Sequence, residues 1–380
     1  MKIELTPEQK QYKAEFRRFT DEIIMPNAGQ FDREECMPQS VIKALAQRKY
    51  LAATLPSDIG GLGGDAITFG ILNEEIGRGC SSARSLLTVH TMVSQAILRW
   101  GSQEQKSQWL PQLASGDAIG AFALTEPNVG SDAKSVETSA TANGDSFIIN
   151  GRKKWITYGQ IADLFLLFAQ SNGKPTAFLV ERDRPGVTVR PIRGISGTKA
   201  SMLAEIHFES CQIPKENLLG ASGFGFVVVG ASALEWGRYS VACGCIGIGQ
   251  ACLEASLDYT SKRKQFGVYI KEHQLIRQMI TNMVTNLDAA RLLCYYAGYL
   301  KDIGDPAAAT EVFKAKYLAS TMANQAATDA VQIHGANGCS SEYPVERYMR
   351  DAKVMAIIEG SNQIQQLTIA KHVYEANSHF

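Results

Sequence analysis

The sequence lacks the patterns that mark several classes of protein. Its 38 Lys and Arg residues balance 38 Asp and Glu residues, so no electrostatic footprint for nucleic acid or an anionic membrane is present. No run of about 20 apolar residues occurs, and no membrane span is expected. The N-terminus, "MKIELTPEQKQYKAEF", has no long apolar core like that of a signal peptide. We therefore expect a cytoplasmic protein whose partners include neither nucleic acid nor a membrane.

The eight cysteines also lack a pattern. No CxxC pair occurs, Cys243 and Cys245 are separated by one residue, and the others are scattered. This favours reduced thiols that serve as small core residues. Spacing typical of metal ligands is missing as well, so we expect no metal site.

The character of the chain changes twice along its 380 residues, a length that suggests two or three packed units. Helical signals dominate at first, with Thr6 as an N-cap and Pro7 at the first helical position. The glycine loop "DIGGLGGD" is a turn rather than a phosphate loop, because no Gly-Lys-Ser/Thr follows it. Short β-rich runs begin near residue 118, among them "IGAFAL", "LFLLFAQ" and "AEIHFES". From about residue 225 the chain is helical again, and "GRYSVACGCIGIGQACLEASLDYTSKR" predicts a buried core helix.

Two polar clusters in the β-rich part suit a planar cofactor. "ALTEPNVGSD" ends a strand with Thr125 and Glu126, and "KKWITYG" places Trp155 beside Thr157 on a strand. An aromatic face and a hydroxyl offer stacking and one hydrogen bond to a heteroaromatic ring. Core packing or turn chemistry explains either cluster equally well when it is taken alone.

Three further clusters lie in the last part of the chain. "SKRKQFG" offers Arg263, whose fork suits pyrophosphate, together with Phe266, and "QIHGANG" offers Gln332 and a tight backbone. In "VMAIIEGSNQIQQ" a single acid, Glu359, follows two isoleucines. That acid is either a surface glutamate at a helix end or a catalytic base in an apolar pocket.

Taken together and in order, these stretches resemble the acyl-CoA dehydrogenase family of flavoproteins over nearly the whole chain. The residues that carry the resemblance are "FALTEPNVGSD", "KKWIT", "RKQFG", "EYPVERYMRDAK" and "IIEGSNQIQ". The resemblance implies an α+β fold with three parts: an N-terminal helical domain (1–117), a middle β-barrel or sandwich domain (118–224) and a C-terminal four-helix bundle (225–380). It also implies FAD as the cofactor and an acyl thioester as the substrate.

The resemblance assigns cofactor contacts to two groups of residues. Those expected to bind the FAD of the same subunit are Phe122, Leu124, Thr125, Ser131, Trp155, Thr157, Ser361 and Gln363. Those expected to reach the FAD of a neighbouring subunit are Arg263, Gln265, Phe266, Gln274, Gln332 and Gly335. A cofactor shared in this way implies a homo-oligomer, a dimer or a tetramer.

Glu359 aligns with the catalytic base of the family. The α-carbon of a thioester is a weak acid, so a positioned carboxylate must remove its proton, and the Glu359 backbone N–H would stabilise the enolate. The flavin would accept the hydride at N5. Burial beside Ile357 and Ile358 would raise the pKa of Glu359. Some members carry the base just before the arginine of "LEWGRYS" instead, where this chain has Gly237. Residues expected near the substrate are Ser131, Glu235, Arg238 and Gly360.

Further stretches narrow the substrate. "CSSARSLLT", "EWGRYSVACGCIGI" and "RDAKVMAIIEGS" are similar to acyl-carrier-protein dehydrogenases that make methoxymalonyl, hydroxymalonyl or aminomalonyl units for polyketides. Lys199 replaces the arginine of the usual "G-x-R-A/S-S" run, which favours a carrier-protein substrate. A CoA thioester of fatty or branched-chain acid catabolism is the alternative.

Two other interpretations and the electron acceptor stay open. Some relatives with this fold bind DNA, but they should show a basic surface. An oxidase would differ only in how readily oxygen reaches the flavin. The acceptor is therefore oxygen, an electron-transfer flavoprotein or another partner.

Overall fold

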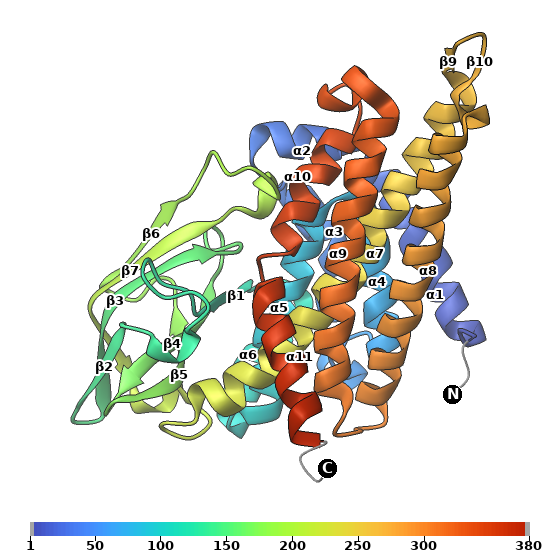
Figure 1. The fold of residues 1–380 in the computed structure, drawn as a ribbon. Coiled ribbons are helices and arrows are strands. Elements are labelled where there is room, and N and C mark those ends of the chain that lie inside the picture. Colours follow the sequence, from blue (N-terminus) through green and yellow to red (C-terminus); the bar gives the residue numbers. More distant parts are fainter. Residues whose placement is uncertain (1–3, 377–380) are drawn as a thin grey trace.

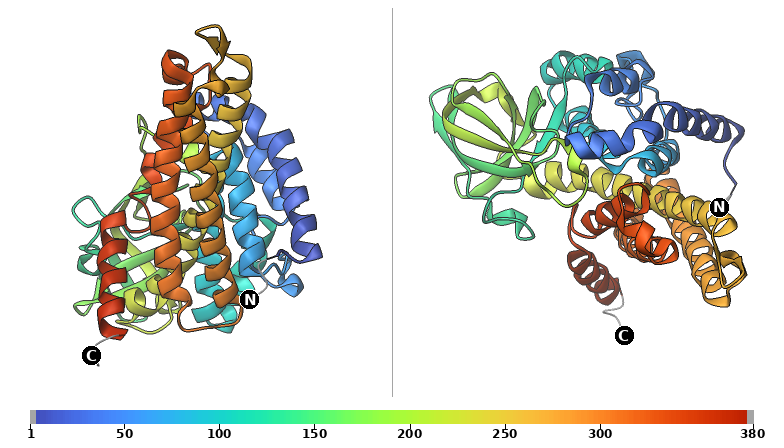
Figure 2. Two further views of the ribbon diagram at one scale, coloured as in Figure 1. Left: turned by 45° about the vertical axis from the view of Figure 1, so that its right-hand side comes forward. Right: turned by 90° about the horizontal axis from the view of Figure 1, so that it is seen from above.

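The computed structural model describes residues 4–376. Figure 1 shows the helices of the first and last parts of the chain packed side by side, with the sheet of the middle part at one flank. The predicted α+β fold is therefore confirmed. Figure 2 shows from above that the sheet and the long C-terminal helices occupy opposite sides of the molecule.

The first part of the chain folds where the helix signals predicted it. Thr6 caps the first helix in a capping box, in which its hydroxyl accepts from the Gln9 N–H at 3.1 Å and its own N–H donates to the Gln9 side chain at 3.0 Å. The "DIGGLGGD" loop ends at Asp65, whose carboxylate caps the fourth helix. The α-helices of this part are α1 (Pro7–Phe19), α2 (Ala28–Glu34), α3 (Gln39–Gln47), α4 (Ala66–Gly79), α5 (Ser81–Trp100) and α6 (Gln103–Ser115).

The middle part forms one mixed sheet. The strands are β1 (Gly120–Ala123), β2 (Ser139–Asn143), β3 (Ser146–Ile156), β4 (Leu164–Ser171), β5 (Lys174–Glu181), β6 (Val187–Pro191), β7 (Ala204–Pro214) and β8 (Leu218–Leu219). Their order is β6-β7-β3-β2-β4-β5-β8, and β1 pairs in parallel with β4. Residues of β4 enter two different cores: Phe168 packs towards the helices and Phe165 into the other face of the sheet. This two-sided burial explains why "LFLLFAQ" is almost entirely apolar.

The last part returns to long helices. They are α7 (Ala231–Lys262), α8 (Gln274–Asp302), α9 (Ala308–His334), α10 (Val345–Met355) and α11 (Asn362–Ala376), and a short hairpin of β9 (Lys264–Gln265) and β10 (Val268–Tyr269) precedes α8. α7 packs against α9, α4 and α5, α10 packs on α9 and α7, and α11 packs along α9. The arrangement places α7 at the centre of the helices.

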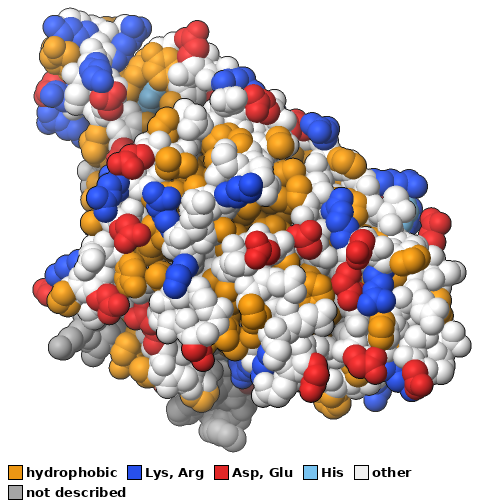
Figure 3. All heavy atoms as spheres, turned by 180° about the vertical axis from the view of Figure 1, so that it is seen from behind, with side chains coloured by type: hydrophobic (Ala, Val, Ile, Leu, Met, Phe, Trp, Pro, Cys, Tyr) orange, Lys and Arg blue, Asp and Glu red, His pale blue; other side chains and the backbone are white. Residues whose placement is uncertain are grey.

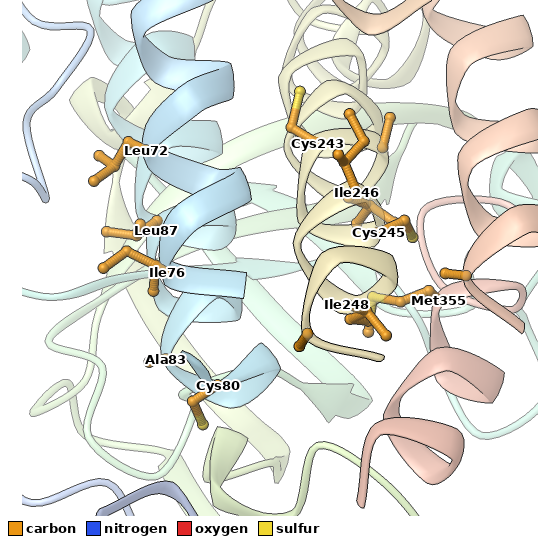
Figure 4. Packing of buried hydrophobic residues seen from close by; sticks show 14 of the residues in the cluster. Leu72, Ile76, Cys80, Ala83, Leu87, Cys243, Cys245, Ile246, Ile248 and Met355 are labelled. Carbon is orange, nitrogen blue, oxygen red and sulfur yellow. The ribbon is translucent and has the colours of Figure 1, made fainter. Parts of the chain in front are cut away.

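Small residues on α7 allow its neighbours to approach closely. A Cβ on Gly247 would fall 2.1 Å from the Glu74 carbonyl oxygen of α4. Figure 4 shows the side chains of α4 and α5 on one side of α7 and Met355 of α10 on the other. Gly225–Lys262 is long and apolar enough to cross a membrane, but 78% of its apolar window is buried inside the protein. The stretch is therefore a core helix, as its small residues predicted.

The surface carries charges of both signs. On the face opposite to that of Figure 1, Lys and Arg side chains are interspersed with Asp and Glu, and blue side chains gather near the end that carries β9 and β10 (Figure 3). Charges of both signs are thus spread over this face, and the cations are denser at the end that carries β9 and β10.

Candidate functional site

Glu359 lies in the turn between α10 and α11, and three elements hold that turn. Its backbone oxygen accepts from Arg238 Nε of α7 at 3.2 Å and from Gln365 Nε2 of α11 at 3.0 Å. The next carbonyl oxygen, that of Gly360, accepts from Lys316 Nζ of α9 at 2.8 Å. Glu359 and Gly360 have φ values of 55° and 86°, so the turn is left-handed at both residues. The backbone is thereby fixed, and the direction of the Glu359 side chain is fixed with it.

The carboxylate of Glu359 points inward and ends without a partner. Its Oε2 atom is buried, makes no hydrogen bond and lies beside α7, where a Cβ on Gly237 would fall 2.4 Å from it. The same Cβ would lie 2.8 Å from Met92 Sδ of α5. The missing side chain of Gly237 is therefore what leaves room for the acid. Position 237, which the resemblance offered as the alternative place for the base, thus carries no side chain and leaves space for Glu359.

Burial raises the pKa of Glu359, and three cations oppose that shift: Arg238 of α7, Arg84 of α5 and Lys316 of α9. Burial also lowers the pKa of Lys316 to about 8. Ile357 was expected to shield the acid, but it is 57% exposed and does not do so. Ile358, in contrast, packs against the main core. The acid is enclosed mainly by side chains distant in sequence.

The β1 strand and the loop after it carry four of the predicted flavin contacts. The ring of Phe122 packs against that of Phe168, with centroids 5.1 Å apart and an angle of 56° between the ring planes. Leu124 is buried in the same core. Thr125 is half-buried, and its carbonyl oxygen accepts from the Lys154 N–H at 2.8 Å. Ser131 lies exposed in the loop that follows.

Trp155 and Thr157 lie where β3 ends. Trp155 has a φ of 62° at a register shift between β3 and β7, and its side chain is 48% exposed. Such a bulge re-aims a side chain. Thr157 lies in the turn after Ile156 rather than on the strand as predicted. β3 continues past the bulge to Ile156, which pairs with Ala204 of β7, and the strand ends one residue before Thr157.

A buried ion pair that the sequence did not predict joins these two segments. Lys153 Nζ lies 2.6 Å from Glu126 Oε1 and 3.0 Å from the Leu124 carbonyl oxygen, and Lys153 is fully buried. Glu126 also accepts from the backbone N–H groups of Glu137 and Thr138. The pair ties β3 to the loop after β1. No local pattern points to the pair, because Glu126 and Lys153 are 27 positions apart in the chain.

Four of the six residues predicted to reach a neighbour's FAD line a hollow of about 330 Å³. Arg263, Gln265, Phe266 and Gly335 line it, together with a stacked pair of Tyr259 and His334 whose ring centroids are 4.2 Å apart. The further predicted residues Gln274 and Gln332 are exposed and do not line it. Phe266 forms the tip of the β9–β10 hairpin and is 94% exposed.

The two groups lie far apart within one chain. Lys316, which holds the Glu359 turn, and His334, which lines the hollow, are 18 positions apart on α9, or about 27 Å at 1.5 Å per residue. Near Glu359, Ser361 directly precedes α11 and Gln363 lies in its first turn, and the Ser361 hydroxyl accepts from the Ile364 N–H at 3.4 Å. Ser361 and Gln363 thus lie next to Glu359, whereas Arg263, Gln265, Phe266 and Gly335 lie at the hairpin end.

Glu235, which was expected near the substrate, and His90 both have partners within the protein. The Glu235 carboxylate pairs with Lys301, whose ammonium lies 4.0 Å from the centre of the Trp236 ring. His90 is fully buried, with Nε2 2.9 Å from the Leu113 carbonyl oxygen and Nδ1 accepting from the Gly120 N–H. Burial lowers the pKa of His90 to about 4. The neutral ring of His90 therefore joins α5 to α6 and β1.

Comparisons with known proteins agree with this geometry. Residues 6–117, 121–211 and 223–374 match the N-terminal, middle and C-terminal domains of acyl-CoA dehydrogenase. The short-chain specific acyl-CoA dehydrogenase of Rattus norvegicus mitochondria is 38% identical over 98% of this chain and 91% of its own.

Solved structures agree as well. Butyryl-CoA dehydrogenase from Megasphaera elsdenii superposes with a TM-score of 0.94, at 33% identity, over 98% of this chain and 100% of that one. The prolyl acyl carrier protein oxidase AnaB gives 0.93 at 29% identity over 97% and 100%, and FkbI, for biosynthesis of the methoxymalonyl extender unit, gives 0.87 at 30% over 96% and 99%. With a match along almost its whole length, the chain belongs to the acyl-CoA dehydrogenase family of FAD-dependent oxidoreductases.

Proposed function

We propose that the protein dehydrogenates a short acyl group held as a thioester on an acyl carrier protein, with Glu359 as the base. The observation that carries the proposal is the Glu359 carboxylate, whose Oε2 is buried without a partner while hydrogen bonds from α7, α9 and α11 fix its turn. A buried carboxylate with a structural role would be paired. An unpaired one is suited to receive a proton from a ligand.

The residues present fit FAD. At the sheet end, the half-exposed ring of Trp155 and the hydroxyl of Thr157 offer stacking and a hydrogen bond. At the hairpin end, Arg263 lines the hollow and forms none of the ion pairs found within residues 4–376, so its guanidinium is available for a phosphate. Gly335, with a φ of 61°, has open space where a Cβ would stand.

The chain's own groups supply acid–base chemistry and orientation. Glu359 takes the α-proton at its carboxylate, and its raised pKa brings it closer to that of the carbon acid. Among the hydrogen bonds of the described residues none uses the Glu359 N–H, so this donor can bind the thioester oxygen on which charge develops. FAD, when bound, accepts the β-hydride.

Support for a carrier-protein substrate comes from sequence and from two solved relatives. Lys199 stands in "GTKAS", in a short turn between β6 and β7 whose Ser201 hydroxyl lies 2.8 Å from that of Ser85. AnaB is an acyl carrier protein oxidase, and FkbI serves an extender-unit pathway. By this analogy we place the chain in extender-unit biosynthesis of a polyketide.

A CoA substrate is the second candidate. It is favoured by the 38% identity to the short-chain specific acyl-CoA dehydrogenase. Such an enzyme would act in fatty or branched-chain acid catabolism and pass its electrons to an electron-transfer flavoprotein.

We also propose that the protein is a homo-oligomer, a dimer or a tetramer. The hollow at the hairpin end is separated from Glu359 by much of α9, so it would receive the FAD of a neighbouring subunit. α8 and the turn after it leave large apolar side chains exposed, among them Leu275, Leu292 and Ile303. A partner subunit would cover them.

The deciding experiment is anaerobic bleaching of the flavin absorbance. Plain acyl, hydroxyacyl and aminoacyl groups are offered to the FAD-loaded protein, each once on CoA and once on a carrier protein. Bleaching only by carrier-bound groups supports the first proposal, and bleaching by plain acyl-CoA supports the second. Glu359→Gln should keep FAD and slow bleaching by about 10²- to 10⁴-fold. Bleaching at the normal rate in that variant would rule out Glu359 as the base.

A further inference from the structure

Arg84 of α5 is a buried cation without an anionic partner. It is 1% exposed, and no carboxylate oxygen of residues 4–376 lies within 4.0 Å of its nitrogens. Its contacts are Nη1 to Thr88 Oγ1 at 2.7 Å and Nη2 to Met355 Sδ at 3.2 Å. A guanidinium has five donors, so most of them have no strong acceptor within the protein. A buried charge left in this state destabilises the fold.

The buried arginine of the neighbouring helix shows what a structural role requires. Arg78 of α4 is 2% exposed and forms ion pairs with Glu75, Asp21 and Glu254. Both arginines are enclosed to the same degree, but only Arg78 has carboxylate oxygens within 4.0 Å, while Glu359 and Asp351 act on Arg84 from farther away. The contrast indicates that the anion or acceptor for Arg84 comes from outside the chain.

The position of Arg84 relates it to the catalytic base. Arg84, Thr88 and Met92 are spaced four residues apart on α5, so they share one face of the helix. Opposite them lie Gly244 and Gly237 of α7. A Cβ on Gly244 would fall 2.9 Å from Arg84 Nε and Cδ, while one on Gly237 would meet both Met92 and the Glu359 carboxylate. Arg84 and Glu359 therefore lie along the same seam between α5 and α7.

A chain of hydrogen bonds aims the guanidinium along this seam. Thr88 Oγ1 accepts from Arg84 and lies 2.6 Å from Ser240 Oγ, which donates to Asn73 Oδ1 at 2.6 Å. Because a guanidinium only donates, the Thr88 hydroxyl accepts from Arg84 and donates to Ser240 Oγ, and the Ser240 hydroxyl donates to Asn73 Oδ1. The hydrogen bond to Thr88 therefore directs the Arg84 guanidinium along α5 towards Met92 and Glu359, by about one helical turn of 5.4 Å.

We propose that Arg84 is a specificity residue that binds an oxygen function at the far end of the substrate's acyl group. The acyl group is therefore short and ends in a carboxylate or a hydroxyl rather than a methyl group. This inference rests on the proposed function, because it takes Glu359 as the point where the α-carbon is held. Arg84 and Met92 are about 12 Å apart along α5, and the guanidinium reaches one turn towards Met92 by bonding Thr88. The remaining turn of about 5.4 Å limits the acyl group to a few carbons.

The test compares acyl groups of equal length. Butyryl, 4-hydroxybutyryl and succinyl thioesters have four carbons and end in a methyl, a hydroxyl and a carboxylate. Their dissociation constants are measured by titration calorimetry on the FAD-loaded protein, on CoA and on a carrier protein. Glu359→Gln is present throughout to prevent turnover. The variants are Arg84→Met, Arg84→Lys and the matched control Arg78→Met.

The expected result is that succinyl or 4-hydroxybutyryl binds at least about tenfold more tightly than butyryl when Arg84 is present. Whichever of the two binds more tightly identifies the terminal group. Arg84→Met should abolish the preference and keep butyryl binding, Arg84→Lys should keep part of it, and Arg78→Met should leave it unchanged. Thermal unfolding without ligand should be as high or higher in Arg84→Met, because an unpaired buried charge is removed, and lower in Arg78→Met.

Three results would overturn the inference. If butyryl binds as tightly as the polar thioesters to the protein that contains Arg84, the subsite is absent although the proposed function stands. An unchanged preference in Arg84→Met, with a lower unfolding temperature, assigns Arg84 to the fold alone. If no thioester binds to a protein with a full complement of FAD, the proposed function fails and the subsite fails with it.

Discussion

Gly237 faces the Glu359 carboxylate, and the absence of a side chain at Gly237 leaves room for it. Gly237→Ala would place a methyl group 2.4 Å from Glu359 Oε2, closer than nonbonded atoms approach. The carboxylate must move, and a shift of about 1 Å in a catalytic group costs on the order of 10²-fold in rate. We expect kcat to fall by about this factor while FAD stays bound, as measured by steady-state kinetics and flavin absorbance.

The control for this substitution lies on the same helix. A Cβ on Gly249 would meet Met322 Sδ at 2.7 Å and Leu287 Cδ1 at 3.1 Å, which are ends of flexible side chains away from the base. Gly249→Ala should change stability and leave kcat near that of the natural sequence. Equal losses of kcat in both variants would show that crowding of α7, rather than displacement of Glu359, is responsible.

The charge of Lys316 affects the titration of the base. Burial raises the pKa of Glu359, and the cations Arg238, Arg84 and Lys316 lower it. Activity requires the ionised carboxylate, so kcat/KM should rise with pH through the pKa of Glu359 and be lost as pH falls. Lys316→Met removes one cation and should move this acid limb to higher pH. An acid limb that stays in place or moves to lower pH contradicts the assignment, and Lys316→Arg is the control that retains the charge.

At the scale of elements, one ion pair connects the strand that carries Trp155 to the loop after β1. Lys153→Met would leave the Glu126 carboxylate buried and unpaired, which costs about 3–5 kcal/mol. We expect a matching loss in the free energy of unfolding by denaturant and a lower ratio of FAD to protein. Adding Glu126→Gln should recover part of the stability, because a neutral amide tolerates burial better than a lone carboxylate. A double variant no more stable than Lys153→Met would show that the cost lies in packing.

Local signals explain which elements could be predicted. The capping box at Thr6, the small residues of α7 and the two-sided burial of β4 each leave a mark in consecutive residues. The sequence therefore predicted the order of helical and β parts. The bulge that gives Trp155 a positive φ leaves no such mark, because it depends on the register of β3 against β7.

The residues of the site also differ in whether the sequence could predict them. Glu359 could be predicted because a motif of neighbouring residues carries it. Of its surroundings, the resemblance indicated Gly237 and Arg238, but nothing pointed to Arg84, which is 275 positions away in the chain. That Arg84 has no carboxylate partner within residues 4–376, while Arg78 six residues earlier has three, depends on which helices meet and is invisible in the sequence.

At the scale of the whole molecule, the residues predicted to bind FAD fall into two groups that the structure separates along α9. Glu359 and Trp155 belong to one group, and Arg263 and Phe266 to the hollow at the other end of α9. If the hollow receives a neighbour's FAD, two defective chains can complement each other. Glu359→Gln and Arg263→Ala should each be nearly inactive alone. When the two chains are co-expressed, a mixed oligomer contains a site with Glu359 from one chain and Arg263 from the other.

The expected outcome is that the mixed oligomer regains activity, up to one intact site for each mixed pair, measured as turnover per FAD after purification with two different affinity tags. The matched control pairs Glu359→Gln with Trp155→Ala. These two residues belong to the same group, so every site in that mixture lacks one of them and activity should not return. Recovery in the first mixture alone requires that residues from two subunits complete each site. If neither mixture recovers although mixed oligomers form, each FAD is held within a single chain, and Arg263 then acts on the cofactor of its own subunit or on the fold.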